Sequence, residues 1–411
     1  MKTVIRPETE MTDSGIDTVK KMPLSWSKIR LKNLVKIRTG NEDTQNATPN
    51  GKYRFYVRSP IVERCDRYTF EGEAILVAGD GAGAGRIFHL VNGRYAVHQR
   101  VYCLSDFKYN AKFVHYYLEN LFPFEMDKGS AQSTVPSMRL PMLLNFNLVL
   151  PGENECLKIV DYLDETCSKI NEIIAEAKES IDEYKELKQS VIFEAVTKGL
   201  DKNVGMKDSG IEWIGETPDS WNIRMLNQYV SQVKCKNSDL SETNLLSLSY
   251  GKIKRKDINS NGGLLPESFD NYNIVDENDI VLRLTDLQND HKSLRVGLVT
   301  ERGIITSAYV TVRPKKINAA YLALLLHAFD YKKGFYGMGS GIRQGLTFDG
   351  VKSLKIVVPS DSEQDDIVKY VMKMINKCDS LISEKESLIN DLEAYKKSLI
   401  YEVVTGKRRV V

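Results

Sequence analysis

The chain has 411 residues, more than one ordinary hydrophobic core organises, so we expect two or more domains. Hydrophobic residues make up 42% and charged residues 27%, as in ordinary water-soluble globular proteins. No apolar run reaches the roughly 18 residues that cross a bilayer, and Met1 to Glu10 lack the apolar stretch of a signal peptide, so we expect a cytoplasmic protein. The six cysteines form no C-x-x-C pair, so neither a zinc site nor a disulfide framework is indicated.

The net charge of +2 is unevenly distributed along the chain. Residues 24–150 hold 17 Lys and Arg against 11 Asp and Glu, and residues 221–358 hold 19 against 13, so each block carries +6. Residues 152–198 hold 6 against 12, a net charge of −6. Basic blocks favour a polyanionic partner because phosphate contacts release counterions, although an excess of this size is also common by chance.

The chain contains an internal duplication. Met11–Ile16 reads M-T-D-S-G-I and reappears as M-K-D-S-G-I at Met206–Ile211, and a Pro-x-Ser-Trp segment ends first at Trp26 and again at Trp221. Matches continue in order to the end of the chain: Asn110 with Asn318, Pro151 with Pro359, Glu155 with Glu363, Ile159 with Ile367, Tyr162 with Tyr370, Ser190 with Ser398, Glu194 with Glu402 and Thr197 with Thr405. Two half-molecules of one plan therefore follow each other.

Each half begins with a block of strand character. Runs rich in β-branched and aromatic residues predict strands near 53–62, 74–78, 86–91 and 95–104, a helix over 110–121 and a strand over 145–150. The second half predicts strands near 245–250, 279–283, 295–300 and 304–313, a helix over 318–329 and a strand over 354–358. Gly-Ser loops at 129–130 and 339–341 precede the last strand of each block. Each block is expected to form a small α/β domain.

A long helix is predicted after Pro151 and after Pro359, with acidic residues in its first turn. Apolar residues recur at alternating spacings of 4 and 3, which indicates a coiled-coil seam, and only Lys385 interrupts the second row. Each helix would extend about 45 residues, or about 65 Å at 1.5 Å per residue. The predicted seam residues are Ile159, Leu163, Ile170, Ile173, Ile181, Tyr184, Val191, Ile367, Val371, Met374, Leu381, Leu388, Leu392, Tyr395 and Leu399.

Two helices with one seam each are expected to bury those seams against each other, and the shortest route makes them antiparallel. A larger bundle with other chains is the alternative. The expected architecture is a mixed α+β fold, in which two α/β domains are separated by two long antiparallel coiled-coil helices and the halves are related by pseudo-two-fold symmetry. We expect an N-terminal segment over 1–23 that repeats 199–218, α/β domains over 24–151 and 221–359, a linker over 199–220, and long helices over 152–198 and 360–409.

The sequence offers no catalytic site. It has no phosphate-binding G-x-x-x-x-G-K-[ST] loop, no Asn-Pro-Pro-aromatic motif of an amino-methyltransferase, and no histidines at metal-ligand spacing. The glycine-rich run from Gly79 to Arg86 leads into another predicted strand, whereas a dinucleotide site needs a helix there. His98 could be a general base, but a packing or hydrogen-bonding role on a strand is the favoured interpretation.

The layout resembles the specificity subunits of type I restriction–modification enzymes, and the resemblance covers essentially the whole chain. It rests on the two Asp-Ser-Gly-Ile and Ser-Trp segments, the two Pro-led heptad helices, and the helix ends Val196-Thr197 and Val404-Thr405. It implies that each α/β domain reads one half of a split DNA site, with the helices as spacer ruler and docking platform. It further implies partners: two methyltransferase subunits using S-adenosylmethionine, and two restriction subunits using ATP and Mg²⁺. This chain would itself be non-catalytic and bind no cofactor or metal.

Base readout requires polar side chains on loops that can enter a groove. Taken alone, each candidate is more readily explained as a solvated surface residue than as a base reader, but both sets fall in equivalent parts of the repeat. The first domain offers Arg54, Arg58, Asp80, Arg86, Gln99, Arg100, Ser130 and Gln132. The second offers Lys252, Lys254, Arg255, Lys256, Arg283, Asp286, Gln288, Asn289, Arg343 and Gln344.

Two other functions fit the same layout. One is the specificity chain of a related restriction system that recognises a bipartite site, which would differ in its partners. The other is a scaffold in which two domains bind proteins and the helices space them. A strong salt dependence of DNA binding would exclude the scaffold.

Overall fold

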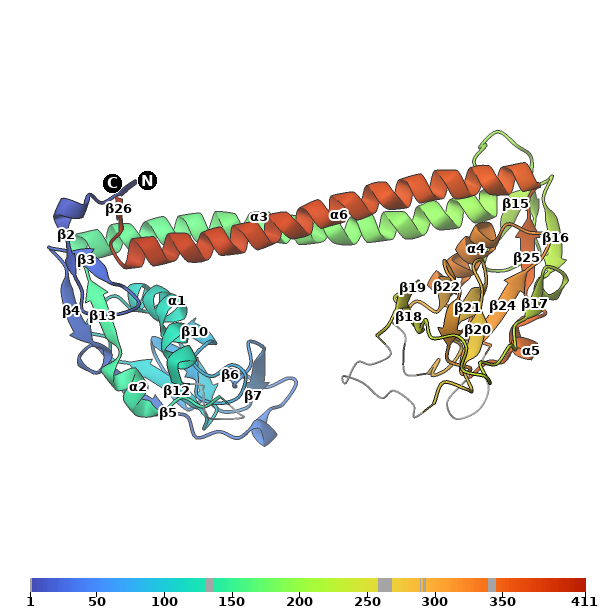
Figure 1. Ribbon diagram of the computed structural model, residues 1–411. Helices are drawn as coiled ribbons and strands as arrows, with labels where there is room; N and C mark the ends of the chain where they lie inside the picture. Colours follow the sequence, from blue (N-terminus) through green and yellow to red (C-terminus); the bar gives the residue numbers. More distant parts are fainter. Residues whose placement is uncertain (1, 130–135, 258–267, 289, 291–292, 339–344) are drawn as a thin grey trace. The chain divides into compact units, whose positions relative to one another are not determined.

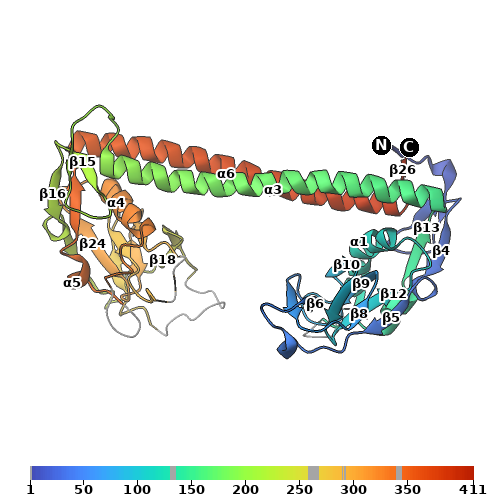
Figure 2. The same ribbon diagram turned by 180° about the vertical axis from the view of Figure 1, so that it is seen from behind.

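The computed structural model describes residues 2–129, 136–257, 268–288, 290, 293–338 and 345–411 (Figure 1). The chain divides into two compact units, Met1–Ala177 with Glu386–Val411, and Lys178–Lys385. Each unit combines one α/β domain with part of two long helices, α3 (Glu153–Lys198) and α6 (Asp361–Val404), which Figure 2 shows from behind. No helix in the described ranges is both long and apolar enough to cross a membrane.

Two four-stranded sheets form the domain of the first unit. One has the order β10 (Phe88–Val91), β9 (Ala74–Ala78), β12 (Val101–Ser105), β5 (Lys36–Thr39) and is antiparallel throughout. The other has the order β7 (Val62–Cys65), β6 (Tyr53–Tyr56), β11 (Arg94–Val97), β8 (Phe70–Glu71), with β6 and β11 parallel. Ile75 and Val77 of β9 share a core with helix α1 (Ala111–Gly129), whereas Leu76 packs into a core with strands β6 and β11. Burial on both faces explains why β9 is apolar throughout.

The domain of the second unit repeats this plan. Its main sheet has the order β17 (Val230–Gln232), β24 (Val310–Pro314), β21 (Ile280–Leu282), β22 (Val296–Leu298). Two further pairs join β18 (Leu246–Ser249) to β19 (Lys252–Arg255), and β20 (Asn273–Val275) to β23 (Gly303–Ile305). Helix α4 (Ala319–Tyr331) starts at Asn318, whose side chain accepts the N–H groups of Ala320 and Tyr321. Ile280 and Leu282 face the core shared with α4, as Ile75 and Val77 face α1.

The strands and helices predicted for both domains are present, with two kinds of difference. The runs near 53–62, 95–104 and 304–313 are each divided by a turn into two strands, because backbone bonds such as Val101 N–H to His98 O reverse the chain. The pattern missed β4 (Ser27–Arg30), β5, β8, β16 (Asn222–Met225), β17, β19 and β20, and the short helices α2 (Leu140–Asn145) and α5 (Phe348–Val351). Except for β20, each missed strand lies at the edge of its sheet or in an exposed pair, where a continuous apolar pattern is not required.

The two Asp-Ser-Gly-Ile motifs form the same hairpin. Strand β2 (Met11–Asp13) pairs with β3 (Lys21–Pro23), and β14 (Met206–Asp208) with β15 (Glu216–Pro218). Gly15 and Gly210 each adopt φ of 60°, and their N–H groups donate to Asp13 and Asp208 at 2.8 and 2.9 Å. The motif recurs because this turn requires a residue that tolerates positive φ and an acceptor beside it.

Each hairpin leads into a tryptophan that joins its domain to a long helix. Trp26 donates its Nε1–H to Glu155 at 3.0 Å, and Trp221 donates to Glu363 at 2.9 Å. Both carboxylates lie in the first turn of a helix, α3 or α6, where the helix dipole stabilises negative charge. In the first unit the buried Arg6 also pairs with Glu155. The matched Trp and Glu positions of the duplication therefore form the same contact in both halves of the chain.

Beside each tryptophan, the first and last strands of the domain pair with each other. Strand β4 (Ser27–Arg30) pairs with β13 (Asn147–Leu150), and β16 (Asn222–Met225) pairs with β25 (Lys355–Val358). At the end of the first unit, β1 (Thr3–Ile5) pairs with β26 (Arg408–Val410), which brings the two termini together (Figure 1).

Helices α3 and α6 pair antiparallel in both units, as predicted. In the first unit Lys396 donates to Asn171 at 2.8 Å, and in the second Lys188 forms an ion pair with Asp379. The residue later in α3 therefore pairs with the residue earlier in α6, which is the antiparallel order. Ile159, Leu163, Ile170, Ile181, Ile367, Val371 and Leu399 are buried, and Tyr184, Val191, Met374, Leu381 and Leu392 are half-buried.

Three of the predicted seam residues lie outside the seam. The side chains of Ile173, Leu388 and Tyr395 are 45%, 40% and 55% exposed. Their neighbours Ile174 and Ile389 are buried instead, and Lys396 is half-buried. In Ile173-Ile174 and Leu388-Ile389 either apolar residue fits the spacing, so only packing decides which one faces the partner helix. At position 396 the aliphatic stem of lysine takes a place that the pattern assigned to tyrosine.

Trp221→Phe is expected to lower the free energy of unfolding by about 2 kcal/mol, because it leaves the Glu363 carboxylate without its indole donor. Urea unfolding monitored by far-ultraviolet circular dichroism measures the change. Trp213→Phe is the matched control, because the Trp213 Nε1–H is buried without a hydrogen-bond partner among the described residues. Equal losses in the two variants would show that volume, and not the bond to Glu363, matters at Trp221.

Two groups on α4, the half-buried His327 and the buried Asp330, titrate in opposite senses. Burial lowers the pKa of His327 from 6.5 to about 4, and raises the pKa of Asp330 from 3.8 to about 6. As pH falls from 6.5 to 4, the unfolded chain takes up a proton that native His327 refuses, so stability is lost. As pH falls from 6 to 3.8, Asp330 takes up its proton in the native protein before it does so in the unfolded chain, so stability is gained.

Asp330→Asn is therefore expected to make stability fall more steeply between pH 6.5 and 4, because it removes the compensating titration. Denaturant unfolding at half-unit pH steps measures this slope. His327→Gln is the reciprocal variant and should make stability rise over the same interval. Parallel pH profiles for Asp330→Asn and the unaltered chain would contradict the assignment.

Candidate DNA interface and partner surfaces

In the first domain, four of the predicted DNA-binding residues gather where strands end. Arg58 follows β6, Asp80 follows β9, and Arg100 precedes β12. Arg58 Nη1 lies 3.1 Å from Asp80 Oδ1, and Arg100 Nε lies 3.7 Å from Asp80 Oδ2. Gln99, next to Arg100, donates to Asp43 at 2.9 Å. The Asp80 carboxylate thus sits between two guanidinium groups that are about half exposed and can still reach a ligand.

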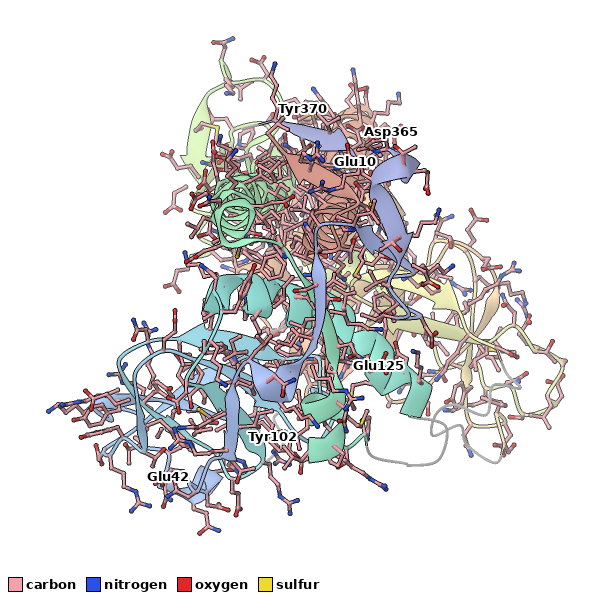
Figure 3. All side chains as sticks on the ribbon, turned by 90° about the vertical axis from the view of Figure 1, so that its left-hand side faces the viewer. Glu10, Glu42, Tyr102, Glu125, Asp365 and Tyr370 are labelled. Carbon is pink, nitrogen blue, oxygen red and sulfur yellow. The ribbon has the colours of Figure 1, made fainter. Side chains whose placement is uncertain are left out.

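Cavities flank Asp80 on both sides. One of about 490 Å³ is lined by Arg58, Ser59 and Asp80, and one of about 400 Å³ is lined by Gln99, Arg100, Ser137 and Arg139. Tyr102, which borders the second cavity, and Glu42 lie on the side of this domain away from α3, whereas Glu10 lies near the start of α3 (Figure 3). The polar cluster therefore occupies the end of the domain opposite its helix attachment.

The glycine-rich run forms a tight loop before strand β10, as predicted. Gly81 and Gly85 have φ of 75° and 62°. A Cβ at Gly83 would lie 2.2 Å from Ile87 Cδ1 and 2.8 Å from Arg58 O, so the loop requires glycine there. Since β10 follows and no helix begins here, the loop cannot cradle a pyrophosphate at a helix N-terminus.

The remaining candidates of the first domain lie apart from Asp80 or outside the described residues. Arg86 pairs with Asp127 of α1 and borders a cavity of about 680 Å³ beside α6. Arg54 is exposed on β6. Ser130 and Gln132 lie outside the described residues. His98 is buried and its Nδ1 accepts the N–H of Arg100 at 3.0 Å, while burial lowers its pKa, as fits a structural role.

In the second domain the candidates form two groups. Arg283, Asp286 and Gln288 follow the central strand β21, as Asp80 follows β9, and Arg283 lies 3.3 Å from the Asp290 carboxylate. The basic group on β19 is divided: Lys252 reaches Asp379 of α6 at 3.7 Å, Arg255 pairs with Glu301, and Lys254 and Lys256 are exposed. Asn289, Arg343 and Gln344 lie outside the described residues.

The two domains share one further contact at this end. In the first, Met138 N–H donates to Gly79 O at 2.8 Å, and in the second Leu346 N–H donates to Leu284 O at 2.8 Å. Each bond ties the segment before the last strand to the loop after the central strand. The first bond places Ser137 and Arg139, the neighbours of Met138, beside Asp80 in the second cavity. The sequence pattern missed both residues because they are distant from Asp80 in the chain.

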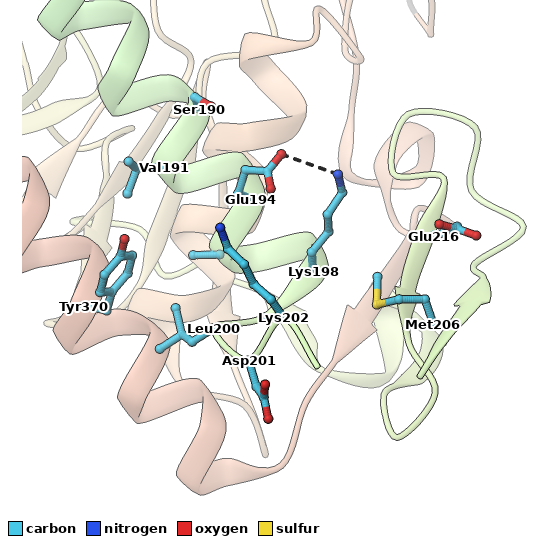
Figure 4. Close-up of a pocket in the computed structure, with 12 residues that line it drawn as sticks. Ser190, Val191, Glu194, Lys198, Leu200, Asp201, Lys202, Met206, Glu216 and Tyr370 are labelled. Atoms are coloured by element: carbon cyan, nitrogen blue, oxygen red, sulfur yellow. Dashed lines mark hydrogen bonds and ion pairs between the residues drawn. The ribbon is translucent and has the colours of Figure 1, made fainter. Parts of the chain in front are cut away.

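Near the ends of the long helices, the units carry corresponding surface cavities. In the second unit a cavity of about 610 Å³ lies between the end of α3, the segment 199–206 and Tyr370 of α6 (Figure 4). In the first unit a cavity of about 400 Å³ is lined by Ile5, Met11 and Glu402. Met11 and Glu402 are the repeat counterparts of Met206 and Glu194, which line the larger cavity. Exposed apolar side chains border both, including Ile5, Leu200 and Tyr370.

No group of three or more metal-binding side chains occurs in the part of the chain that the structure describes.

Comparisons with known proteins agree with this layout. The family model described as the type I restriction modification DNA specificity domain matches residues 23–183 and 218–391. The specificity subunit of type I restriction enzyme EcoDI from Escherichia coli is 24% identical over 182 residues, 44% of this chain and 40% of that protein. The putative MjaX specificity subunit from Methanocaldococcus jannaschii is 23% identical over 304 residues, 72% of this chain and 66% of that protein. The chain thus spans less than two thirds of the length of either relative.

A solved chain from work on complex assembly and conformational transition of the type I R-M system shares the fold, with a TM-score of 0.67 and 13% identity. The match covers 94% of this chain and 99% of the solved one. Because the family model matches both halves and most of the sequence, the chain belongs to the family of type I restriction–modification DNA specificity proteins.

Proposed function

We propose that this chain is the DNA-recognition subunit of a type I restriction–modification complex. Each α/β domain reads one half of a bipartite site. The single observation that supports this most is the repeated placement of polar groups after the central strand of each domain, Asp80 in one and Arg283 to Gln288 in the other. The scaffold around these loops is duplicated while the loops differ, as is expected if two domains of one plan read different sequences.

The long helices act as a ruler and as a docking platform in this proposal. Each continues without a break from one unit into the other, over 46 residues in α3 and 44 in α6, so the helix length bears on the gap between the half-sites. The corresponding cavities of the two units suit two copies of one partner, which would be the modification subunits. Those subunits would supply S-adenosylmethionine-dependent adenine methylation, and restriction subunits would supply the ATP- and Mg²⁺-dependent steps. The chain itself would take no catalytic part.

A host that expresses this chain with its cognate modification subunit is expected to carry methylated adenines in one split motif. That motif has two short specified halves around a fixed unspecified gap. Methylome sequencing reads both the target and the gap. Exchanging residues 221–359 for the corresponding block of another specificity chain should change one half of the motif only.

Two results would contradict this function. A stable complex of the chain with the modification subunit and no new methylation would favour the protein-binding scaffold. Methylation of a motif that changes in both halves after the domain exchange would show that the domains do not read the site separately.

Base readers and phosphate contacts should separate in binding assays. Arg100→Ala is expected to reduce discrimination at the first half-site alone, because its guanidinium lines the polar cavity beside Asp80. The double variant Lys254→Ala with Lys256→Ala should weaken binding to every sequence and lower the slope of log affinity against log salt by about 2. Fluorescence anisotropy at salt concentrations from about 50 to about 300 mM measures both effects.

The matched control is Lys373→Ala with Lys377→Ala, an exposed lysine pair on α6 outside the proposed interface. An unchanged salt slope in the β19 variant, or an equal change in the control, would contradict the assignment of Lys254 and Lys256 to phosphate contacts.

A further inference from the structure

Arg295, at the start of β22, is a fully buried arginine whose guanidinium uses all five of its N–H donors. The side chain is 0% exposed. Nε donates to Tyr336 Oη at 3.1 Å. Nη1 donates to Arg283 O and Thr285 O at 3.0 and 2.9 Å, and Nη2 donates to Asp286 O and Asp290 O at 3.3 and 2.5 Å. The guanidinium geometry of five fixed donors is thus matched by five neutral oxygen acceptors.

Four of these acceptors are backbone carbonyls of the loop that follows β21. The described part of this loop, residues 283–288 and 290, is neither helix nor strand. Arg295 donates to each of these four carbonyls, and Asp286 O also accepts the N–H of Asp290 at 3.2 Å. Since a buried carbonyl without a partner is costly, these bonds stabilise the conformation of the loop. Leu284 and Leu287 are buried beneath the loop, and Asp286 adopts φ of 57°, so the backbone follows one defined path around the guanidinium.

The surroundings of Arg295 make this arrangement hard to replace. Asp330 accepts the backbone N–H of Arg295 at 2.7 Å, and the Tyr336 ring lies 4.9 Å from the guanidinium carbon. Tyr336 Oη also donates to Asp290 O at 3.1 Å. A buried positive charge is tolerated only when hydrogen bonds and a nearby carboxylate compensate its lost hydration, so the position favours arginine specifically.

The opposite side of the loop carries the predicted DNA-binding side chains. Gln288 is exposed, and Arg283 and Asp286 are half-buried. The corresponding loop of the first domain, 79–87, is held differently, by glycine turns and by the bond from Gly85 N–H to Ala78 O at 2.8 Å. The second loop has no glycine between Arg283 and Arg295, and its conformation is stabilised by hydrogen bonds from the buried guanidinium.

We propose that Arg295 is a positioning residue for sequence readout by the second domain: it touches no DNA, but it fixes the backbone from which Arg283, Asp286 and Gln288 reach the bases. The inference rests on the proposed function of the chain. It makes sequence discrimination at one half-site depend on a residue that does not contact the DNA.

The test uses the full chain in complex with its modification subunits, and DNA duplexes in which one half-site at a time is altered. Arg295→Lys keeps the charge but has three donors in place of five, so it leaves at least two of the five acceptors, and at least one of the four loop carbonyls, without their bond to residue 295. The expected result is a loss of about tenfold in discrimination at the second half-site. Discrimination at the first half-site should stay within about twofold, and binding to unrelated DNA should be unchanged, because phosphate contacts elsewhere are intact. Tyr336→Phe, which removes one acceptor, should give a smaller loss in the same direction.

Arg313→Lys is the matched control for general damage to the domain. Arg313 lies on β24 and pairs with the buried Asp279 at 2.7 Å, but it makes no bond to the described residues of the loop, 283–288 and 290. It should lower the thermal midpoint of the second unit without changing half-site discrimination.

The possible outcomes distinguish failure of this inference from failure of the proposed function. If the unaltered complex discriminates at both half-sites and Arg295→Lys does so equally well, the inference alone is overturned. If Arg295→Lys and Arg313→Lys lose discrimination in proportion to their loss of stability, Arg295 is merely structural and the inference also fails. If the unaltered complex discriminates at neither half-site, the proposed function itself is wrong.

Discussion

The hydrogen bond from a buried tryptophan to a glutamate in the first turn of a long helix is the contact on which the architecture depends. It is made twice, by Trp26 with Glu155 and by Trp221 with Glu363. At each place the first and last strands of a domain pair beside it, so the chain enters and leaves the domain next to the helix. In the function that we propose, such an attachment holds each DNA-reading domain in a fixed orientation relative to its helix.

The antiparallel helices complement this attachment through a seam that is not purely apolar. Lys188 with Asp379 and Lys396 with Asn171 cross between α3 and α6. The first pair is partly buried and the second is exposed, so they flank the apolar seam and help to specify which residues lie opposite each other. A slip by one heptad would separate both pairs. A fixed register suits the role of ruler that we propose for α3 and α6.

The two domains reach the same loop placement by different physical means. In the first, Gly81 and Gly85 supply positive φ and Gly83 allows a close approach to Arg58 O and Ile87. In the second, Arg295 gathers four carbonyls of the loop from inside. Glycines let a backbone turn tightly because they carry no side chain, whereas a buried guanidinium supplies hydrogen-bond donors to the carbonyls of the loop. The scaffold strand before the loop is equivalent in both domains, so loops of different sequence and length can follow one frame.

The sequence by itself determined the duplication, the two α/β blocks, both long helices and the glycine loop that leads into a strand, because these depend on local composition and on periodicity. Tertiary structure alone decided which of Ile173 and Ile174, or of Leu388 and Ile389, faces the partner helix, since both members of each pair satisfy the spacing. It also decided that Arg58, Asp80 and Arg100 form one cluster while Arg86 turns to Asp127, and that Arg295 lies inside the second domain. An arginine in a sequence reads as an exposed cation, and only the fold can place five acceptors around it. The physical reason is the same in each case: periodicity reports which residues can be buried, but the choice among them depends on partners that are distant in the chain.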